Sequence, residues 1–364
     1  MTDTAASARS VGAAEAVRLA ADGHRVIDVR QPSEWDAGHI PGATLLPLGD
    51  LPSRLAEVLP DRDEPLLVHC AVGARSTRAS AYLAANGYTR VANMAASLAD
   101  WRVAGGPWET PSSALTEEQS RRYARQLLVP GVGADGQRRL LEARVLVVGA
   151  GGLGSPAAVY LAAAGIGTIG LLDDDVVELS NLQRQVLHAT SRIGQPKTSS
   201  GRTALEALNP TVRVIEHPER LDASNAERLL AGYDVIVDGS DRFETRYVVN
   251  DAAVMLRKPV VHASVYRWEG QVTTLVPFEG PCYRCLHPVP PPAELAPDCD
   301  VAGVMGTLPG IAGTLQANEA IKLVLGVGEL LVGRLLTFDA SSVEFREITV
   351  PRDPACPACG EGAA

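Results

Sequence analysis

The sequence has no surplus of positive charge, since its 364 residues carry a formal net charge of −10 at pH 7. A nucleic-acid-binding surface needs clustered lysine and arginine, so direct nucleic-acid binding is not expected. Residues 1–9 contain no apolar run of the kind found in a signal peptide. The six cysteines are too few and too unevenly spaced for a disulfide framework. These absences favour a cytoplasmic protein in a reducing compartment.

One uncharged stretch, residues 145–172, is long enough to suggest a membrane span. It contains many glycines and a proline, however, and it divides into a strand, a turn, a helix and a second strand. We therefore expect a buried α/β core and no membrane partner. The apolar content of 46% is ample for such cores, and the chain length allows two or three domains.

The N-terminal part predicts a helix over 13–20 capped by Ser10, strands at 25–29 and 65–69, and a helix from 77 to 86. Cys70 directly follows the second strand and opens a loop that contains Gly73 and Arg75. Loop N–H groups and a helix N-terminus stabilise a thiolate or a persulfide anion, and Arg75 would add a nearby cation. A single cysteine after a strand is more often a core residue, but this loop favours a reactive thiol.

The segment at 28–43 contains Glu34-Trp35 and Gly38-His-Ile-Pro-Gly-Ala, and the Cys70 loop closes at Arg75 after six residues. Together they resemble a rhodanese domain, with a match that covers residues 5–108. The resemblance implies that Cys70 carries a persulfide sulfur and passes it on. Residues 93–101 lack the Gly-Gly pair usual in that family, a departure that leaves the loop itself intact. Residues 109–116 are expected to be a linker.

The stretch 144–164 predicts a buried strand, a glycine-rich turn and a helix with Pro156 in its first turn. Such a unit lets backbone N–H groups approach a phosphate at a helix N-terminus. Asp173 ends the next strand, where an acidic side chain contacts ribose hydroxyls. NAD, FAD and ATP all remain possible ligands on these features alone. The glycines of the turn are Gly149, Gly151, Gly152 and Gly154.

Charged residues farther along the chain favour ATP. Arg184 and Lys197 follow the ribose position, and attack on a triphosphate needs such fixed cations, whereas hydride transfer does not. Asp241 follows a strand that ends at residue 238, and it is placed to hold magnesium or to cap the next helix. Three arginines within 121–125 would ordinarily form a solvated helix face.

Two Cys-x-x-Cys pairs lie far apart near the end of the chain. Four thiolates so spaced predict a closed, structural zinc site that pins the C-terminal tail, residues 351–364, to the rest of the domain. The proline-rich segment 288–300 between the pairs is expected to be a mobile loop, and it carries Cys299. The pairs are Cys282 with Cys285, and Cys356 with Cys359.

Residues 117–360 resemble the MoeB/ThiF family, the bacterial relatives of ubiquitin-activating enzymes. The resemblance implies a Rossmann-like α/β domain over 117–350 that forms a homodimer. It also implies that ATP and magnesium are used to adenylate the C-terminal Gly-Gly carboxylate of a ubiquitin-like sulfur-carrier protein. The residues that carry it lie at 122–126, 149–154, 173–175, 180–185 and 194–197, at Asp241, and in both cysteine pairs.

The same resemblance implies roles for individual side chains. Asp173 would bind ribose, and Asp241 would hold magnesium. Arg125 would reach into the partner subunit's active site. The phosphates would be bound by Asn181, Arg184 and Lys197.

Both halves together resemble adenylyltransferase/sulfurtransferases of the MoeZ type, although there the rhodanese domain usually follows the adenylating domain. The implied product is the carrier thiocarboxylate, made with a persulfide on Cys70 that a cysteine desulfurase or thiosulfate would load. Cys299 is a candidate second thiol. Two other functions remain open: a non-catalytic hub that binds the carrier and the sulfur donor, and an NAD-dependent oxidoreductase.

Overall fold

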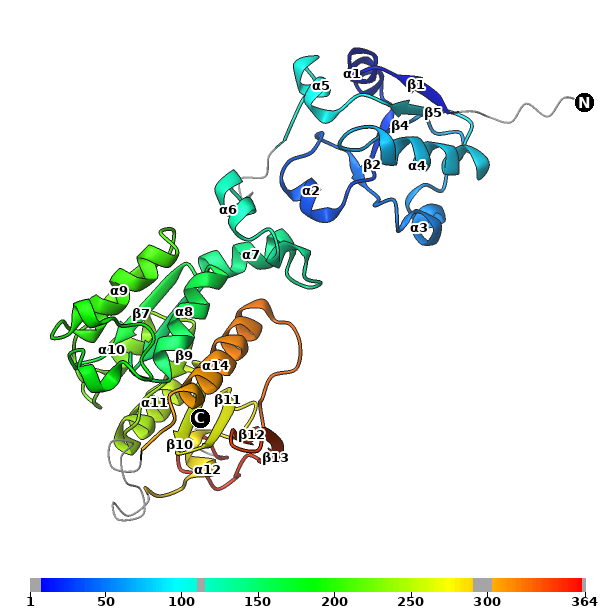
Figure 1. Cartoon of the computed structure of the whole chain (residues 1–364). Coiled ribbons are helices and arrows are strands. Elements are labelled where there is room, and N and C mark those ends of the chain that lie inside the picture. The colour runs from blue at the N-terminus through cyan, green and yellow to red at the C-terminus, as the bar shows by residue number, and fades with distance from the viewer. Residues whose placement is uncertain (1–7, 110–114, 291–302, 362–364) are drawn as a thin grey trace, which may run out of the picture. The chain divides into compact units, whose positions relative to one another are not determined.

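A computed structural model of the chain describes residues 8–109, 115–290 and 303–361 (Figure 1). Its internal contacts divide it into two units, Met1–Ala134 and Asp135–Ala364. Cys299 and most of the segment 288–300 lie outside the described residues, and so do residues 362–364.

The first unit contains a five-stranded parallel sheet with the order β1-β5-β4-β2-β3. Its central strands are apolar and buried on both faces, as expected for strands covered by helices on each side. The predicted strands at 25–29 and 65–69 are confirmed as β2 and β4. The strands are β1 (Arg9–Val11), β2 (Arg25–Asp28), β3 (Thr44–Leu45), β4 (Leu66–His69) and β5 (Val91–Met94).

Alternate residues of these strands point to opposite faces and build two separate cores. Val26 and Leu67 pack with α1 (Ala13–Ala21) and α5 (Leu98–Val103) on one face. Residues that point to the other face pack with α3 (Leu51–Val58) and α4 (Ala74–Ala85). A short helix, α2 (Pro32–Asp36), follows β2.

Two predicted helix starts need correction. Ser10 lies in β1, and Gly12 is the N-cap of α1, so the predicted Ser10 cap is wrong. Helix α4 begins at Ala74, earlier than the predicted residue 77, because Gly73 takes a left-handed conformation with φ of 89° and turns the chain directly into the helix. The backbone N–H groups of Arg75 and Ser76 therefore belong to the first helical turn.

A short helical region follows. Helix α6 (Glu117–Arg122) begins at the predicted capping box, in which the Thr116 hydroxyl accepts from the Gln119 N–H and the Gln119 side chain accepts from the Thr116 N–H. It is followed by η1 (Gln126–Leu128) and α7 (Gly133–Glu142).

The second unit is built on an eight-stranded sheet with the order β13-β12-β11-β10-β9-β6-β7-β8. The strands from β10 to β8 in this order are parallel, and β11, β12 and β13 add antiparallel strands at one side. The strands are β6 (Arg144–Val148), β7 (Thr168–Leu172), β8 (Arg213–His217), β9 (Val235–Asp238), β10 (Val260–Tyr266), β11 (Glu269–Leu275), β12 (Arg334–Asp339) and β13 (Glu344–Thr349).

Helices cover both faces of this sheet (Figure 1). On one face α8 (Gly154–Ala164) packs against both α9 (Lys197–Leu208) and α14 (Thr307–Leu325). A further core lies on the other face, where residues of β6 and β9 meet α10 (Ala226–Ala231), α11 (Phe243–Leu256) and Tyr283 of α12 (Tyr283–Leu286).

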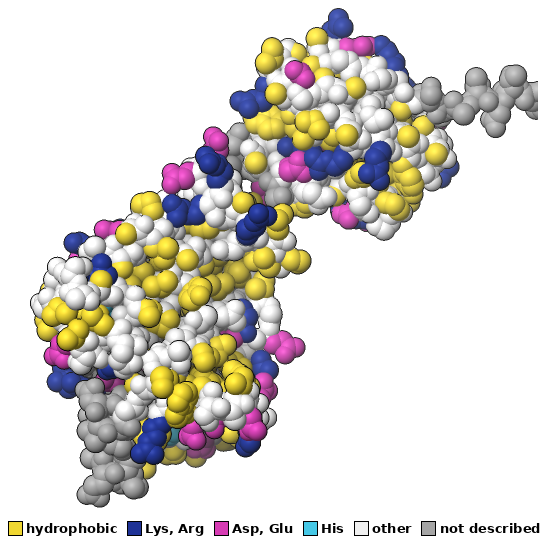
Figure 2. Space-filling model, viewed as in Figure 1, with side chains coloured by type: hydrophobic (Ala, Val, Ile, Leu, Met, Phe, Trp, Pro, Cys, Tyr) yellow, Lys and Arg dark blue, Asp and Glu magenta, His cyan; other side chains and the backbone are white. Residues whose placement is uncertain are grey.

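The uncharged stretch 145–172 forms most of β6, a turn, α8 and β7, as predicted. Among the described residues, no helix has the length and apolar character needed to cross a membrane. On the face shown in Figure 2, lysine and arginine side chains are interspersed with aspartate and glutamate side chains.

Candidate functional site

A cavity of about 670 Å³ opens where β6, β7 and β9 end. The carboxyl ends of parallel strands meet there, which is where α/β proteins bind ligands. Most of the residues that the sequence predicts for nucleotide binding line this one cavity, although they come from five separate segments. They are Gly149, Gly151, Gly152, Asp173, Asn181, Arg184, Lys197 and Asp241.

Two glycine-containing loops meet closely beside the cavity. Gly154 begins α8, and a Cβ there would lie 1.8 Å from the Gly149 carbonyl oxygen. A Cβ on Gly239 would lie 2.9 Å from the Gly154 nitrogen. Only glycine allows these backbones to approach so closely. The contact brings the loop that carries Asp241 against the glycine-rich turn.

Asp173 and Lys197 connect the turn to α9. The Asp173 carboxylate accepts from the Ala150 N–H at 2.8 Å and from the Asp175 N–H at 2.9 Å. The buried Lys197 ammonium lies 2.8 Å from the Asp175 carboxylate and 3.9 Å from that of Asp173. Burial raises the pKa of Asp173, an effect that Lys197 and the two N–H donors oppose.

Asn181 and Arg184 lie on the segment that passes the mouth of the cavity. The buried Asn181 side chain accepts from the Glu178 N–H at 3.1 Å and thereby fixes the short helix η2 (Leu179–Asn181). The Arg184 guanidinium is half-buried and donates to the Ser180 carbonyl at 3.2 Å. Asp241, in the loop after β9, is exposed and lines the same cavity.

The Asp241 loop is supported by a buried polar group beneath it. Asp238 accepts from the Ser240 hydroxyl at 2.6 Å and from His262 Nδ1 at 2.9 Å, and Arg246 donates to the Ser240 carbonyl. Burial opposes ionisation of Asp238, but the donors and the nearby Arg246 charge lower its pKa. Burial lowers the pKa of His262, so the ring is a neutral donor at pH 7.

Several lining residues are absent from the predicted set. Gln185 is buried, and its Oε1 atom has no hydrogen-bond partner among the described residues. It lies in the same motif as Asn181 and Arg184, so the motif could have identified it. Gly239 and Arg220 also line the cavity. Arg220 follows β8, and no sequence signal connects it with the glycine-rich turn.

In the first unit, the Cys70 sulfur lies inside the loop that links β4 to α4. The Gly73 N–H donates to it at 3.1 Å, and the Ser76 hydroxyl lies 3.7 Å away. Burial alone would raise the pKa of Cys70, but hydrogen bonds from Ser76 and from the backbone of Val72 and Arg75 lower it. The loop therefore favours a sulfur anion at this position.

The Arg75 guanidinium forms a two-point ion pair with Glu34, with distances of 2.6 and 2.7 Å. This contact raises the pKa of Arg75 and lowers that of Glu34. The Arg75 charge is thus paired with that of Glu34, and the contact anchors α2 to the loop. The backbone and Ser76 supply most of the stabilisation of the Cys70 anion. Neighbouring His69 is buried, which lowers its pKa to about 4, so it carries no charge at pH 7.

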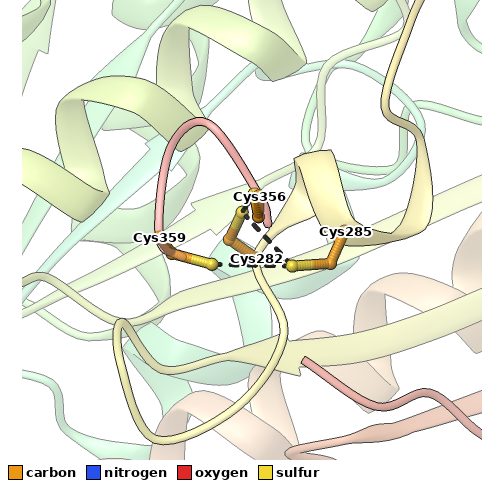
Figure 3. Close-up of side chains that lie close together, drawn as sticks. All are labelled: Cys282, Cys285, Cys356 and Cys359. Carbon is orange, nitrogen blue, oxygen red and sulfur yellow. Dashed lines mark hydrogen bonds between the residues drawn. The ribbon is translucent and has the colours of Figure 1, made fainter. Parts of the chain in front are cut away.

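The four predicted metal ligands converge in the second unit (Figure 3). Their sulfur atoms are separated by 3.9 Å for Cys282 and Cys285, 3.6 Å for Cys282 and Cys356, and 3.5 Å for Cys285 and Cys359. Four sulfurs at about 2.3 Å from a tetrahedral zinc ion lie about 3.8 Å apart, so the donors fit such an ion. Burial raises the pKa of Cys282, so without a cation its thiol stays protonated.

Arg125 immediately precedes η1, and its side chain is exposed. The structure describes one chain, so the predicted reach of Arg125 into a partner remains a prediction. The predicted role of Cys299 concerns a residue outside the described part of the chain.

The fold and the cavity define a nucleotide-binding α/β protein joined to a second α/β domain with a cysteine loop. The chain belongs to the ThiF family, whose model matches residues 123–358, and residues 13–104 match the rhodanese-like domain. The predicted fold class and the order of the two domains are confirmed.

Proteins of known name agree with this assignment. A sulfur carrier protein adenylyltransferase of Thermus thermophilus is 51% identical over 251 residues, which cover 68% of this chain and 93% of that protein. The probable adenylyltransferase/sulfurtransferase MoeZ of Mycobacterium tuberculosis is 49% identical over 255 residues, which cover 69% of this chain and 65% of MoeZ. These names bear out the predicted class of enzyme.

The solved structures support the same fold. The microcin C7 biosynthetic enzyme MccB, in complex with N-formylated MccA, superposes with a TM-score of 0.60 at 25% identity. The match covers 68% of this chain and 77% of MccB.

Proposed function

We propose that the chain adenylates the C-terminal Gly-Gly carboxylate of a ubiquitin-like sulfur-carrier protein and then converts it to a thiocarboxylate. The observation that carries the proposal is the cavity at the strand ends. It combines a glycine-rich turn with Lys197 and Asp241. Relatives of the chain that are named as a sulfur carrier protein adenylyltransferase and as MoeZ support the same function.

In the first reaction, a carboxylate oxygen of the carrier attacks the α-phosphorus of ATP, and pyrophosphate leaves. The turn from Gly149 to Gly154 would offer backbone N–H groups to the phosphates, and Asp173 would bind the ribose. Asp241 would hold magnesium, which supplies positive charge against the phosphate oxygens. The cations proposed to stabilise the charge that develops on phosphorus are Arg184, Lys197 and, from a partner subunit in a homodimer, Arg125.

In the second reaction, a persulfide anion on Cys70 attacks the acyl-adenylate, and AMP leaves. The product is an acyl disulfide that joins the carrier to Cys70. A second thiol, for which Cys299 is the candidate, then attacks the Cys70 sulfur and releases the carrier thiocarboxylate. The resulting disulfide would be reduced by a cellular thiol. A cysteine desulfurase or thiosulfate would supply the sulfur. This chemistry needs free thiols, which the reducing conditions of the cytoplasm maintain, so we propose a cytoplasmic location.

We also propose that the four-cysteine cluster holds a structural zinc ion. All four ligand positions would be filled by protein, which leaves none for a substrate. The domain limits that we propose follow the sequence: 5–108, a linker at 109–116, 117–350, and a tail at 351–364.

The decisive experiment is ATP–pyrophosphate exchange with a small protein that ends in Gly-Gly. We expect exchange that depends on both the carrier and magnesium. Absence of exchange with every carrier tested would favour the non-catalytic hub. Tight NADH binding without ATP binding would instead favour the oxidoreductase.

Replacing Lys197 separates the two reactions. We expect Lys197→Ala to reduce exchange by at least about 100-fold, since one preorganised charge contributes about 3 kcal/mol to such transition states. Sulfur loading of Cys70 should be unchanged. Lys258→Ala, outside the lining of the cavity, is the matched control. Equal exchange by the two variants would contradict the proposed role.

Replacing Cys70 tests the other reaction. We expect Cys70→Ala to keep carrier-dependent exchange and to lose transfer of sulfur, measured as carrier thiocarboxylate by intact-protein mass spectrometry. Thiocarboxylate formed by this variant from a persulfide donor would show that the fused domain is not the sulfur source.

A further inference from the structure

The peptide between Ala150 and Gly151 is held at the back of the glycine-rich turn. His188 Nε2 lies 2.9 Å from the Ala150 carbonyl oxygen, and the Asp173 carboxylate accepts from the Ala150 N–H at 2.8 Å. Ala150 is fully buried, whereas its neighbours Gly149 and Gly151 line the cavity. Both polar groups of Ala150 are therefore paired with side chains of other segments, and the Ser155 hydroxyl of α8 makes a longer contact of 3.3 Å with the same carbonyl oxygen.

The chemistry of the neighbours fixes which ring nitrogen of His188 carries hydrogen. A carbonyl only accepts, so Nε2 must be the N–H that donates to Ala150. On the other side Nδ1 lies 2.9 Å from the Ser200 hydroxyl, and the Arg192 Nε–H donates to that same hydroxyl at 2.9 Å. Arginine only donates, so the Ser200 hydrogen is available for Nδ1. Burial lowers the pKa of His188, consistent with a neutral ring.

This chain of donors runs in one direction, from Arg192 through Ser200 and His188 to the Ala150 carbonyl. Ser200 lies in α9, the helix that begins with Lys197. The glycine-rich turn and the lysine are thus connected by side chains that do not themselves line the cavity.

The consequence concerns the direction of the Gly151 N–H. In a trans peptide the carbonyl and the following N–H point in opposite directions. The described residues contain no cis peptide bond, so this holds for the Ala150–Gly151 peptide. When the Ala150 carbonyl points at His188, the Gly151 N–H points the other way. Glycine at 151 would otherwise make rotation of this peptide easy, because its backbone is the least restricted.

We infer that His188 is a positioning residue for nucleotide binding, because its Nε2–H holds the Ala150–Gly151 peptide in the orientation that presents the Gly151 N–H to a triphosphate. This inference rests on the proposed function, since it assigns a support to the same ATP site. His188 is not among the residues that line the cavity, so its effect is exerted through the peptide.

Two amide substitutions distinguish the two ring nitrogens. The side-chain amide of His188→Gln can occupy the position of Nε2 and keep a donor at Ala150. The shorter amide of His188→Asn can occupy the position of Nδ1 and keep the Ser200 contact. It leaves the Ala150 carbonyl with only the longer contact to the Ser155 hydroxyl, at 3.3 Å. The variants are similar in polarity and differ in the contact they preserve.

The measurement is calorimetric binding of a non-hydrolysable ATP analogue to the full chain with magnesium, together with KM values for ATP and carrier in the exchange assay. We expect His188→Asn to weaken analogue binding by about tenfold, the loss expected when a buried carbonyl loses the shorter of its two hydrogen bonds. His188→Gln should stay within about threefold of the wild type, on the scale of a modest hydrogen-bond change. The KM for the carrier should not change, and neither should sulfur loading of Cys70.

Equal affinities for the wild type and the Asn variant, or equal losses in both variants, would overturn the inference. If the Asn variant does not fold, Ser200→Ala replaces it, because removing the hydroxyl frees the ring to change tautomer, and severalfold weaker binding is expected. An unchanged affinity in Ser200→Ala would then overturn the inference. A wild type that binds no ATP analogue would refute the proposed function itself, which is a separate result.

Discussion

At the scale of single residues, the Cys70 loop stabilises an anion mainly with neutral groups. The sulfur is surrounded by backbone N–H groups and by Ser76, while the charge of Arg75 is engaged by Glu34. A site of this kind suits the proposed exchange between a thiolate and a persulfide on Cys70, since both are anions that N–H and O–H groups stabilise.

Replacing Ser76 tests this view of the loop. The Ser76 side chain helps to lower the pKa of Cys70, so Ser76→Ala should raise it and leave less thiolate at pH 7. The pH dependence of Cys70 modification by a small methanethiosulfonate would report the change. Ser80→Ala is the control, because its buried hydroxyl has no partner among the described residues. A midpoint that does not move in Ser76→Ala would contradict the account.

At the scale of elements, the C-terminal tail is attached to the second unit through its cysteines. The segment after β13 brings Cys356 and Cys359 back to α12, and the Arg352 side chain donates to the carbonyls of Cys359 and Phe278. The cysteines form a small buried cluster with Val254 of α11. A metal ion at this cluster would therefore join two segments that are distant in sequence, α12 and the C-terminal tail.

Removal of one ligand should release the tail. We expect the wild type to contain one zinc ion per chain, and Cys356→Ser to lose it with a fall in Tm of about 10 °C. Structural zinc sites contribute several kcal/mol to the free energy of unfolding. Each kcal/mol that is lost lowers Tm by about 2–4 °C in a unit of this size. Cys299→Ser is the control and should keep both zinc and Tm. Full zinc content in Cys356→Ser would rule out the four-cysteine site.

At the scale of the whole molecule, the chain contains two sheets, each with its own cores. Among the described strands, none of one sheet pairs with a strand of the other. Cooperative unfolding follows from shared buried contacts, so each unit should unfold as its own cooperative transition.

Calorimetry of the full chain should show two transitions. Glu34→Gln should lower only the transition of the first unit, by about 4–8 °C if the partly exposed pair with Arg75 contributes about 1 kcal/mol. Cys356→Ser should lower only the Tm of the transition of the second unit. Because the folded pKa of Glu34 is depressed, its contribution is present above the unfolded pKa and is lost as pH falls through the folded pKa. A single transition that moves in both variants would contradict this independence.

Much of the fold could be predicted from the sequence because its signals are local. The β-branched run at 144–148, the glycines after it and the apolar helix form one strand–turn–helix unit within a short stretch, and steric rules for these residue types suffice to identify it. The two Cys-x-x-Cys pairs specify their own chemistry by spacing. The errors, at Ser10 and at the start of α4, are at helix boundaries. Pairing with β5 places Ser10 in a strand, and the left-handed conformation of Gly73 starts α4 early.

What only the tertiary structure decided depends on contacts between distant segments. The Glu34–Arg75 ion pair, the approach of Gly239 to Gly154 and the His188 contact with Ala150 each join residues whose spacing follows no helix or strand period. Hydrogen bonds such as these depend on directions set by the packed sheets. The sequence by itself determined the type of chemistry, a nucleotide turn, a sulfur loop and a thiolate cluster. Packing decided which buried side chains orient the backbone that performs it.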